Sequence, residues 1–478
     1  MTWEVVIGIE THVELRTHSK MFCGCPVGFG AEPNTAVCPV CLGLPGALPV
    51  PNEKAIEWTM RLGLALGCDI TEHSLFHRKN YFYADMPKNY QISQFDLPLC
   101  VGGHLDVATS AGDRRIGITR VHLEEDTGKS THLGEGGRIG SSGGALVDFN
   151  RAGIPLMEVV SEPDVRTPEE ARVYAQELRA IILALGVSDA RLEEGSMRFD
   201  ANISLRSEGA TELGVKVEVK NMNSLRSLQR ALTFEIERQT KILDGGGTIA
   251  QETRHWDEEA GRTEAGRSKE EASDYRYFSE PDLVPLEVTE DTVAGLRSDL
   301  PELPAQTRTR FEAAGVDAIA ARVLVGGGLV SLFDEAVGSG ATAAEAAKWL
   351  TGEVTAYLNR EGSDPAALPL DGGALAELIA MVEAGDLSST AAKQVLEGVL
   401  SGEGGPRDVA ESRDLIQIRD EGALAEAVAS VVAAHPEEMA RIADGDGKLI
   451  GFLVGQVMQA TGGKADPRRV SELIRESS

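Results

Sequence analysis

The chain has 478 residues, of which 42% are hydrophobic and 25% are charged. This composition is typical of a globular protein with two to four domains, and it excludes a disordered, collagen-like or disulfide-stapled chain. The 75 acidic residues outnumber the 46 basic residues and give a net charge of −29. That charge argues against broad, non-specific nucleic-acid binding but leaves open one locally basic face for tRNA or phosphate. A solubility role for the acidic excess is an equal alternative.

The sequence carries no targeting signal. The N-terminal residues lack the basic start and apolar run of a signal peptide. No stretch of about 18 uncharged apolar residues occurs, so no transmembrane helix is expected. Six cysteines are too few for a disulfide framework in so long a chain. We therefore expect a cytoplasmic protein.

The first 290 residues mix strand and helix patterns. Alternating hydrophobic and polar residues predict strands at 5–9, 115–123, 201–205 and 215–219. In the last of these, three valines share one face and charged residues share the other, so the strand is solvated or lines a polar site. Helices are predicted at 168–185, 224–243 and 52–66, the first with a capping box. This mixture predicts an α+β domain with a mixed or antiparallel sheet.

Beyond residue 304 the strand patterns stop. Alanine-rich amphipathic segments separated by glycine predict an all-helical region of nine helices, and the strongest break in it is at 402–406. The predicted helices are 305–314, 329–336, 342–358, 373–384, 389–400, 422–434, 436–443, 447–461 and 467–476.

Four cysteines fall within nineteen residues. They form a C-x-C pair and a C-x2-C pair, twelve residues apart, with prolines and glycines that provide turns. The spacing favours a structural zinc site, although the C-x-C pair is less common than C-x2-C. A set of buried, reduced cysteines without metal is the alternative. The candidate ligands are Cys23, Cys25, Cys38 and Cys41.

Carboxylates give a second candidate site. Glu10 and His12 share a strand face with Glu14, and Glu158 interrupts an apolar run where an unpaired acid is costly. Residues 124–126 are three consecutive acids at the end of a strand, and Asp200 and Glu218 lie on or beside other strands. Oxygen ligands with one imidazole suit Mg²⁺. The alternative is that most of these acids are solvated surface charge.

A basic and aromatic stretch covers 78–91. Its lysines, amides and tyrosines suit phosphate binding and stacking on a base or ribose. A half-buried aromatic strand with solvated lysines is the alternative.

Glycine and serine are concentrated at 140–144, around Ser141 and Ser142. The segment is similar to the nucleophile segment of amidase-signature hydrolases, with Lys79 as a conceivable base. Because it is short and flanked by glycine, we interpret it as a flexible hairpin tip. The sequence has no phosphate-binding P-loop, dinucleotide or kinase motif.

Several long motifs are distributed over nearly the whole chain. They are IGIETHVEL at 7–15, FGAEPNT at 29–35, RKNYFY at 78–83, YQISQ at 90–94, LEEGSMRFDAN at 192–202, DYRYF at 274–278 and GFLVG at 451–455. Together these motifs resemble one family, the B subunit of the bacterial tRNA-dependent glutamyl/aspartyl amidotransferase.

This resemblance implies an architecture and a reaction. The expected domains are a cradle-like α+β domain at 1–292, an all-α domain at 293–404 and a small all-α tail at 405–478. The expected enzyme is a carbon–nitrogen ligase with glutamine as amido donor. ATP phosphorylates the side-chain carboxylate of a glutamate or aspartate misattached to tRNA, and ammonia displaces the phosphate. A separate amidase subunit supplies the ammonia, and a small third subunit completes a heterotrimer; neither membrane nor DNA is an expected partner.

The resemblance also assigns residues. The expected catalytic set is Glu10, His12, Glu125, Glu158, Asp200 and Glu218. Of these, His12, Glu125 and Glu158 are the expected Mg²⁺ ligands, with Glu125 chosen over its neighbours by resemblance alone. The expected ATP and phosphate contacts are Lys79, Tyr81, Lys88, Asn89, Arg198 and Asn202. The four-cysteine cluster matches the zinc-bearing form of the family.

The tail has a local positive balance, with five basic and two acidic residues from 447 to 475. We expect phosphate contacts with tRNA there, and a solvated helix end is the alternative. The candidate residues are Lys448, Lys464, Arg468 and Arg469. Two rival functions stay open: a non-catalytic tRNA-binding scaffold, and a stand-alone amidase that uses Ser141 or Ser142.

Overall fold

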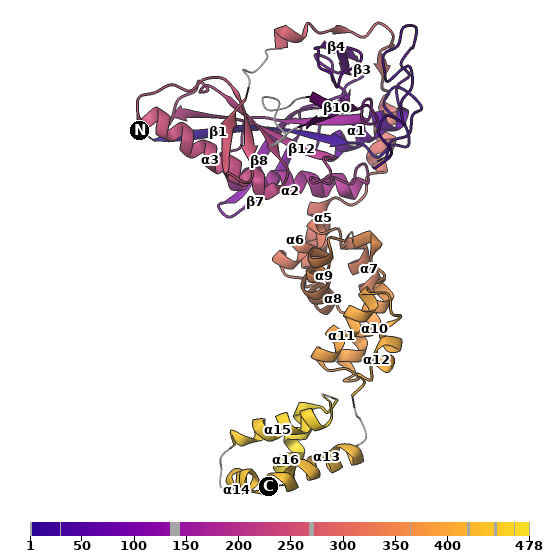
Figure 1. The fold of residues 1–478 in the computed structure, drawn as a ribbon, viewed down its shortest axis with the longest axis vertical. Coiled ribbons are helices and arrows are strands. Elements are labelled where there is room, and N and C mark those ends of the chain that lie inside the picture. Colours follow the sequence, from indigo (N-terminus) through magenta and orange to yellow (C-terminus); the bar gives the residue numbers. More distant parts are fainter. Residues whose placement is uncertain are drawn as a thin grey trace. The chain divides into compact units, whose positions relative to one another are not determined.

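The computed structural model of the chain describes residues 2–28, 30–133, 144–266, 272–363, 365–417, 421–443, 447–462 and 464–477 (Figure 1). It divides into two compact units, Met1–Pro304 and Ala305–Ser478. The first unit holds the strands, and the second contains only helices among its described elements. This confirms the predicted fold class, an α+β region followed by helices.

One large sheet dominates the first unit. Its central strands are antiparallel and follow the order β13-β12-β1-β11-β8. Their bounds are Val217–Met222, Met197–Ser207, Trp3–Glu14, Pro155–Ser161 and Gly112–Glu125. On one side the sheet continues through β14 (Thr253–Asp257), parallel to β13, and β15 (Arg262–Ala265). On the other side lie β6 (Cys100–Val101), β2 (Asp69–Ile70) and β7 (His104–Thr109).

Three helices pack on one face of this sheet: α1 (Glu53–Ala65), α2 (Pro168–Leu185) and α3 (Leu225–Asp244) (Figure 1). They match the three helices predicted from sequence. Each begins at a polar N-cap whose side chain accepts backbone N–H groups, Asn52, Thr167 and Ser224 respectively. Their buried side chains join those of alternate strand residues in a single core, so the opposite face of the sheet is the one left for polar residues.

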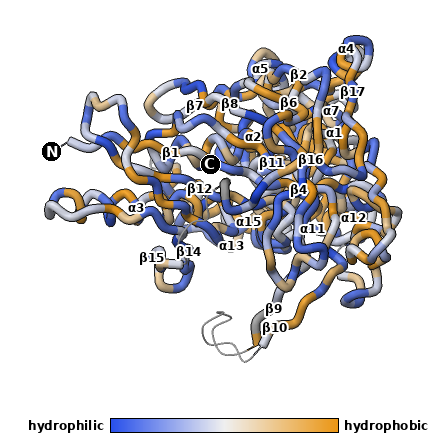
Figure 2. The backbone as a smooth tube through the Cα atoms, turned by 90° about the horizontal axis from the view of Figure 1, so that it is seen from above, coloured by the Kyte–Doolittle hydropathy of each residue, from blue (hydrophilic) through white to orange (hydrophobic). Residues whose placement is uncertain are grey.

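Smaller strand pairs surround the sheet. A three-stranded sheet joins β16 (Phe278–Ser279), β4 (His77–Asn80) and β5 (Tyr90–Ser93). The hairpin strands β9 (Lys129–Leu133) and β10 (Gly144–Asp148) project away from the main sheet (Figure 2). The remaining elements of the unit are β3 (His73–Ser74), β17 (Leu286–Glu287), the 3₁₀ turn η2 (Ala272–Tyr275) and α4 (Glu290–Ser298).

The second unit has two separate hydrophobic clusters. The first cluster is built on α5 to α12 and the second on α13 to α16. The first eight helices are α5 (Pro304–Ala313), α6 (Ala318–Gly326), α7 (Val330–Gly338), α8 (Ala343–Trp349), α9 (Thr355–Glu361), α10 (Gly372–Glu383), α11 (Ser389–Leu400) and α12 (Pro406–Ser412). The π-helical turn η3 (Leu350–Val354) joins α8 to α9, and the 3₁₀ turn η4 (Pro365–Ala367) precedes α10. The last four are α13 (Glu421–Ala434), α14 (Pro436–Ala443), α15 (Leu449–Ala460) and α16 (Pro467–Glu476).

Four local predictions were wrong. Helices α4, α6 and α12 lie where no helix was predicted, and β13 begins at Val217, two residues later than expected. The missed helices are short, and their buried residues are few, so their amphipathic pattern is weak. The divisions at 292 and 404 stay predictions; in the structure α4 packs against α1 within the first unit. None of the described helices has the length and apolar character needed to span a membrane.

Candidate functional site

Polar side chains form a row across the open face of the main sheet. Strand pairing sets Glu10 opposite Asp200, and His12 between Arg198 on one side and Glu158 on the other. The row continues outward because Asn202 is opposite Glu218, and Glu158 is opposite His122. Side chains alternate between the two faces of a strand, and Ile9, Thr11 and Val13 are buried on the other face. The predicted face of β1 is therefore confirmed.

His12, Glu124 and Glu158 form a cluster in the middle of this row. His12 Nε2 lies 3.7 Å from Glu158 Oε2 and 4.0 Å from Glu124 Oε1. His122 Nε2 lies 3.3 Å from the same Glu158 oxygen. Burial alone would raise the pKa of Glu158, but His122, His12 and Lys79 hold it well below its usual range. The carboxylate is thus ionised, as a cation ligand must be.

This trio fits a divalent cation. One ligand atom from each of the three residues lies within 4.8 Å of the others. Two carboxylates and one imidazole suit Mg²⁺, which keeps several waters and bridges to phosphate oxygens.

The structure does not bring Glu125 to the trio. Glu125 is 3% exposed and forms an ion pair with Lys88, whose side chain is 6% exposed. Its Oε1 also accepts the backbone N–H of Ile92 at 2.9 Å. The acid that joins His12 and Glu158 is therefore Glu124, and a role of Glu125 as a magnesium ligand stays a prediction.

A second carboxylate group lies where β12, β1 and β13 meet. Lys220 donates a hydrogen bond to Asp200, and its Nζ lies 3.5 Å from Glu218 Oε1. Asn202 donates to Glu10 Oε1 at 2.9 Å. Burial lowers the pKa of Lys220, but Asp200 and Glu218 outweigh burial and raise it. Lys220 was not among the predicted site residues, although its place two residues after Glu218 on a strand puts it on the same face.

Arg198 is held by two acids. It donates to Glu14 Oε1 at 3.0 Å and to Asp126 Oδ2 at 2.8 Å. Burial and the charge of Asp126 raise the pKa of Glu14 to about 8. Arg198 was expected at phosphate; in the structure its guanidinium is engaged by these two acids.

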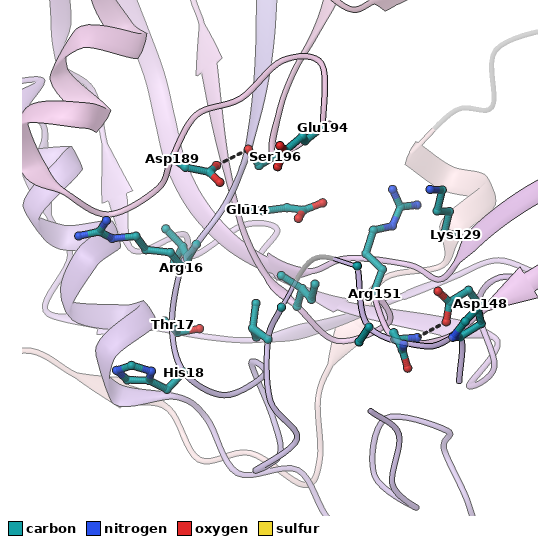
Figure 3. A pocket seen from close by; sticks show the side chains of 18 residues that line it. Glu14, Arg16, Thr17, His18, Lys129, Asp148, Arg151, Asp189, Glu194 and Ser196 are labelled. Atoms are coloured by element: carbon teal, nitrogen blue, oxygen red, sulfur yellow. Dashed lines mark hydrogen bonds between the residues drawn. The ribbon is translucent and has the colours of Figure 1, made fainter. Parts of the chain in front are cut away.

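Glu14 also lines a cavity of about 540 Å³ at the end of the row. Figure 3 shows Glu14 between Asp189, Ser196 and Glu194 on one side and Arg151 and Lys129 on the other. Side chains of both charge signs thus line one cavity, which suits a ligand that carries both. The sequence did not predict this cavity, because its walls come from segments far apart in the chain.

Lys79 lies beside a group of aromatic residues. The Lys79 Nζ lies 4.9 Å from the centre of the Tyr275 ring, and Tyr81 contacts Tyr275 edge-on at 6.2 Å between centres. Tyr277 stacks on Phe95 at 4.2 Å. Burial lowers the pKa of Lys79, but Tyr277, Glu124 and Glu158 outweigh it and raise the pKa. Lys79 is therefore a cation beside the acidic trio.

Two further predicted phosphate contacts lie near Lys79. Tyr81 is mostly buried, and burial raises the pKa of its phenol. Asn89 occupies the turn after Lys88 with a left-handed φ of 62°, and its carbonyl accepts the N–H of Tyr81. Tyr275 and Tyr277 carried no signal of their own in the sequence beyond their place in a family motif.

The four cysteines come together as predicted. Their Sγ atoms lie within 4.8 Å of one another. In a tetrahedral site with Zn–S bonds of about 2.3 Å, neighbouring sulfurs are about 3.8 Å apart. Cys38 Sγ and Cys41 Sγ lie 3.9 Å apart, and Cys41 also accepts the N–H of Cys38 at 3.1 Å. These sulfur distances fit a zinc ion bound by four thiolates.

The predicted tRNA contacts differ in their surroundings. Lys448 and Arg468 are exposed. Lys464 forms an ion pair with Asp414, and Arg469 pairs with Glu472 at 3.0 Å. Ser141 and Ser142 lie outside the described residues.

Comparison with known proteins decides the family. The family model described as the GatB/GatE catalytic domain matches residues 5–294, and the one described as the GatB domain matches residues 331–477. The chain belongs to this amidotransferase family. A Frankia casuarinae relative, named as the B subunit of an aspartyl/glutamyl-tRNA(Asn/Gln) amidotransferase, is 51% identical over 99% of this chain and 95% of its own length.

Other relatives with the same name are equally complete. The Thermodesulfovibrio yellowstonii relative is 49% identical over 99% of both chains, and the Moorella thermoacetica relative is 49% identical over the full length of both. The polar row lies entirely within the part matched by the catalytic-domain model. Membership in the family therefore confirms the resemblance drawn from the sequence motifs.

Proposed function

We propose that the chain is the catalytic B subunit of a tRNA-dependent amidotransferase, an ATP-dependent carbon–nitrogen ligase. Its substrates are glutamate misattached to the glutamine tRNA, aspartate misattached to the asparagine tRNA, or both. The observation that carries the proposal is the His12–Glu124–Glu158 cluster within a row of ionisable side chains on one sheet face. Burying so many ionisable side chains costs folding free energy, and such groups are concentrated at functional sites. Their charges are suited to phosphate and ammonia chemistry.

The reaction needs an activated carboxyl group, because a carboxylate is a poor acceptor for ammonia. Transfer of the γ-phosphoryl group of ATP to the side-chain carboxylate supplies a phosphate leaving group. Within this chain His12, Glu124 and Glu158 would hold Mg²⁺, which neutralises charge on the phosphate oxygens when bound. Lys79, charged and next to two of these ligands, is placed to hold a phosphate oxygen.

The second carboxylate group is suited to proton handling. Ammonia must lose a proton as the amide forms, and Glu10, Asp200 and Glu218 offer acceptors on the same face. Lys220 lies within ion-pair distance of both Asp200 and Glu218 and supplies the positive charge of this group. The acyl phosphate would form at the trio, and ammonia would reach it past Glu10.

The remaining assignments follow the family. The ammonia comes from an amidase partner subunit, a small third subunit completes the heterotrimer, and the protein works in the cytoplasm. The exposed Lys448 and Arg468 of the helical tail contact tRNA phosphates, with Lys464 and Arg469 beside them. The cysteine cluster holds a structural zinc, which has no open position for water.

The test supplies the purified complex with ATP, Mg²⁺, glutamyl-tRNA of the glutamine type, and ammonium chloride in place of glutamine. Wild type is expected to form the amide, and Glu158→Gln is expected to lose this activity. Glu259→Gln is the matched control, because Glu259 is an exposed acid in the turn between β14 and β15. Full activity of Glu158→Gln would favour a non-catalytic scaffold, and ammonia release from glutamine by the isolated chain would favour a stand-alone amidase.

A further inference from the structure

The cysteine cluster touches the buried Lys88–Glu125 pair. Gly43 lies two residues after Cys41, in turns closed by hydrogen bonds from Leu42 to Cys38 and from Gly43 to Val40. A Cβ atom on Gly43 would lie 2.4 Å from Lys88 Cγ. No side chain fits in that space, so the turn that carries Cys38 and Cys41 packs directly on the Lys88 side chain.

The other arm of the cysteine cluster contacts the same lysine. Phe22 directly precedes Cys23, and the Lys88 Nζ lies 5.9 Å from the centre of its ring. The Tyr90 ring lies 5.4 Å from that Nζ. Lys88 is therefore packed against residues next to both cysteine pairs, and its ammonium group faces Glu125.

A second contact reaches Glu125. Gly153 has a φ of 88°, and a Cβ there would lie 3.5 Å from Cys41 Cβ and 3.8 Å from Glu125 Oε2. The same point lies 3.5 Å from Cδ of Lys20, which is 1% exposed. A lysine this deeply buried needs negative charge nearby. Four thiolates around one Zn²⁺ carry a net charge of about −2, and this charge would compensate Lys20.

We propose that the cysteine cluster, by holding zinc, positions the Lys88–Glu125 ion pair beside the acidic row. The cluster contacts Lys88 through Gly43 and Phe22, and it contacts Glu125 through Gly153. Zinc fixes the distance between the two cysteine pairs, and thereby the two surfaces that enclose Lys88. Without the metal, these surfaces separate and Lys88 gains access to water. The metal site thus holds Lys88 and Glu125 in place, and Gly43 is a positioning residue because its turn packs on Lys88.

The chain offers a matched pair of variants. Gly43 and Gly46 both have left-handed φ values, 67° and 86°, in the same loop. Gly43→Ala and Gly46→Ala therefore carry similar backbone strain. A Cβ on Gly46 would meet nothing within 4 Å, however, whereas one on Gly43 would strike Lys88. Any difference in the reactivity of Lys88 between the two variants is therefore caused by the contact between position 43 and Lys88.

The experiment measures the rate at which an amine-reactive acetylating reagent modifies Lys88 in the full chain, read by mass spectrometry. The exposed Lys54 on α1 serves as the internal reference. In zinc-loaded wild type and in Gly46→Ala, Lys88 should react slowly. In zinc-loaded Gly43→Ala, and in wild type depleted of zinc with a chelator, it should react about tenfold faster or more, since local opening governs access.

Continued protection of Lys88 in the zinc-depleted wild type would overturn the proposal, as would equal exposure in the two glycine variants. If Gly43→Ala fails to fold, zinc depletion of wild type decides alone. In the assembled complex, ammonia-dependent amide formation should fall in Gly43→Ala and not in Gly46→Ala. Only this measurement of amide formation rests on the proposed function. Absence of amide from wild type would refute that function and leave the labelling result standing.

Discussion

His12 and Glu158 are direct Cα partners across the β1–β11 pairing, and their Nε2 and Oε2 atoms lie 3.7 Å apart. Because this pairing is set by backbone hydrogen bonds, the two donors are held in place without any metal. A slip of one residue in register would turn all the polar residues of β1 into the core. The sheet therefore preorganises the ligands of the proposed magnesium site.

The structure discriminates between two adjacent acids as metal ligands. Glu124→Gln should weaken Mn²⁺ binding, used as a probe for Mg²⁺, by about tenfold or more. Glu125→Gln should have a smaller effect, because its carboxylate is engaged by Lys88. Titration by electron paramagnetic resonance measures both. Normal affinity in Glu124→Gln, together with lost affinity in Glu125→Gln, would favour the assignment made from family resemblance.

The sequence predicted which residues share the polar face of the sheet, but it did not predict which side chains contact one another. The alternation around Glu10 and His12 gave the correct face, since side chains of one strand alternate regardless of context. The choice between Glu124 and Glu125 depends on where β8 ends and on Lys88, which approaches from a turn 37 residues earlier. Such long-range contacts leave no local pattern.

The same limit explains the fold predictions. Helices with clear caps, such as the one that begins at Thr167, were predicted correctly. The short α6 and α12 depend on tertiary packing and were missed. The clustering of the four cysteines was predicted because they lie close together in the sequence. Lys220, Tyr275 and the walls of the cavity at Glu14, by contrast, are brought together only by the fold.

His122 keeps Glu158 ionised, and its loss should change the pH dependence. His122→Gln removes a favourable charge and hydrogen bond, so the pKa of the buried Glu158 should rise. A carboxylate with a higher pKa is protonated first at low pH. The activity of His122→Gln relative to wild type should therefore be lower at pH 6 than at pH 8. A ratio that does not change with pH would contradict this explanation.

Glu14 should make the first unit less stable as pH rises. Its folded-state pKa of about 8 lies above its ordinary value of 4.5, so the folded state binds more protons between these values. The contribution of Glu14 to the free energy of unfolding is therefore fully present below about pH 4.5 and is lost as the pH rises through about 8.

Glu14→Gln, which is neutral at every pH, should therefore raise the melting temperature relative to wild type at pH 8.5 by about 2–4 °C. At pH 5 the two proteins should differ less. Calorimetric scans at the two pH values measure the effect. A larger gain at pH 5 than at pH 8.5 would be inconsistent with a raised pKa.

The helical tail should contribute to tRNA binding through charge. Replacing Arg468 and Arg469 by glutamate should raise the KM for glutamyl-tRNA by about tenfold at low salt, with little change in kcat. The same two-residue reversal at Arg360 and Lys393, which are exposed on α9 and α11 outside the tail, is the control. Equal effects of the two double variants would mean that overall charge, and not the tail, sets the KM.

We propose that ATP activates the substrate carboxylate at the cluster of His12, Glu124 and Glu158. The most direct test is glutamyl-tRNA-dependent formation of ADP by the complex without any ammonia donor. Wild type and Glu259→Gln should release ADP only when glutamyl-tRNA is present, and Glu158→Gln should lose at least about 99% of this tRNA-dependent rate. Tightly tRNA-coupled ADP formation by Glu158→Gln at the wild-type rate would contradict the account and place the phosphorylation elsewhere in the complex.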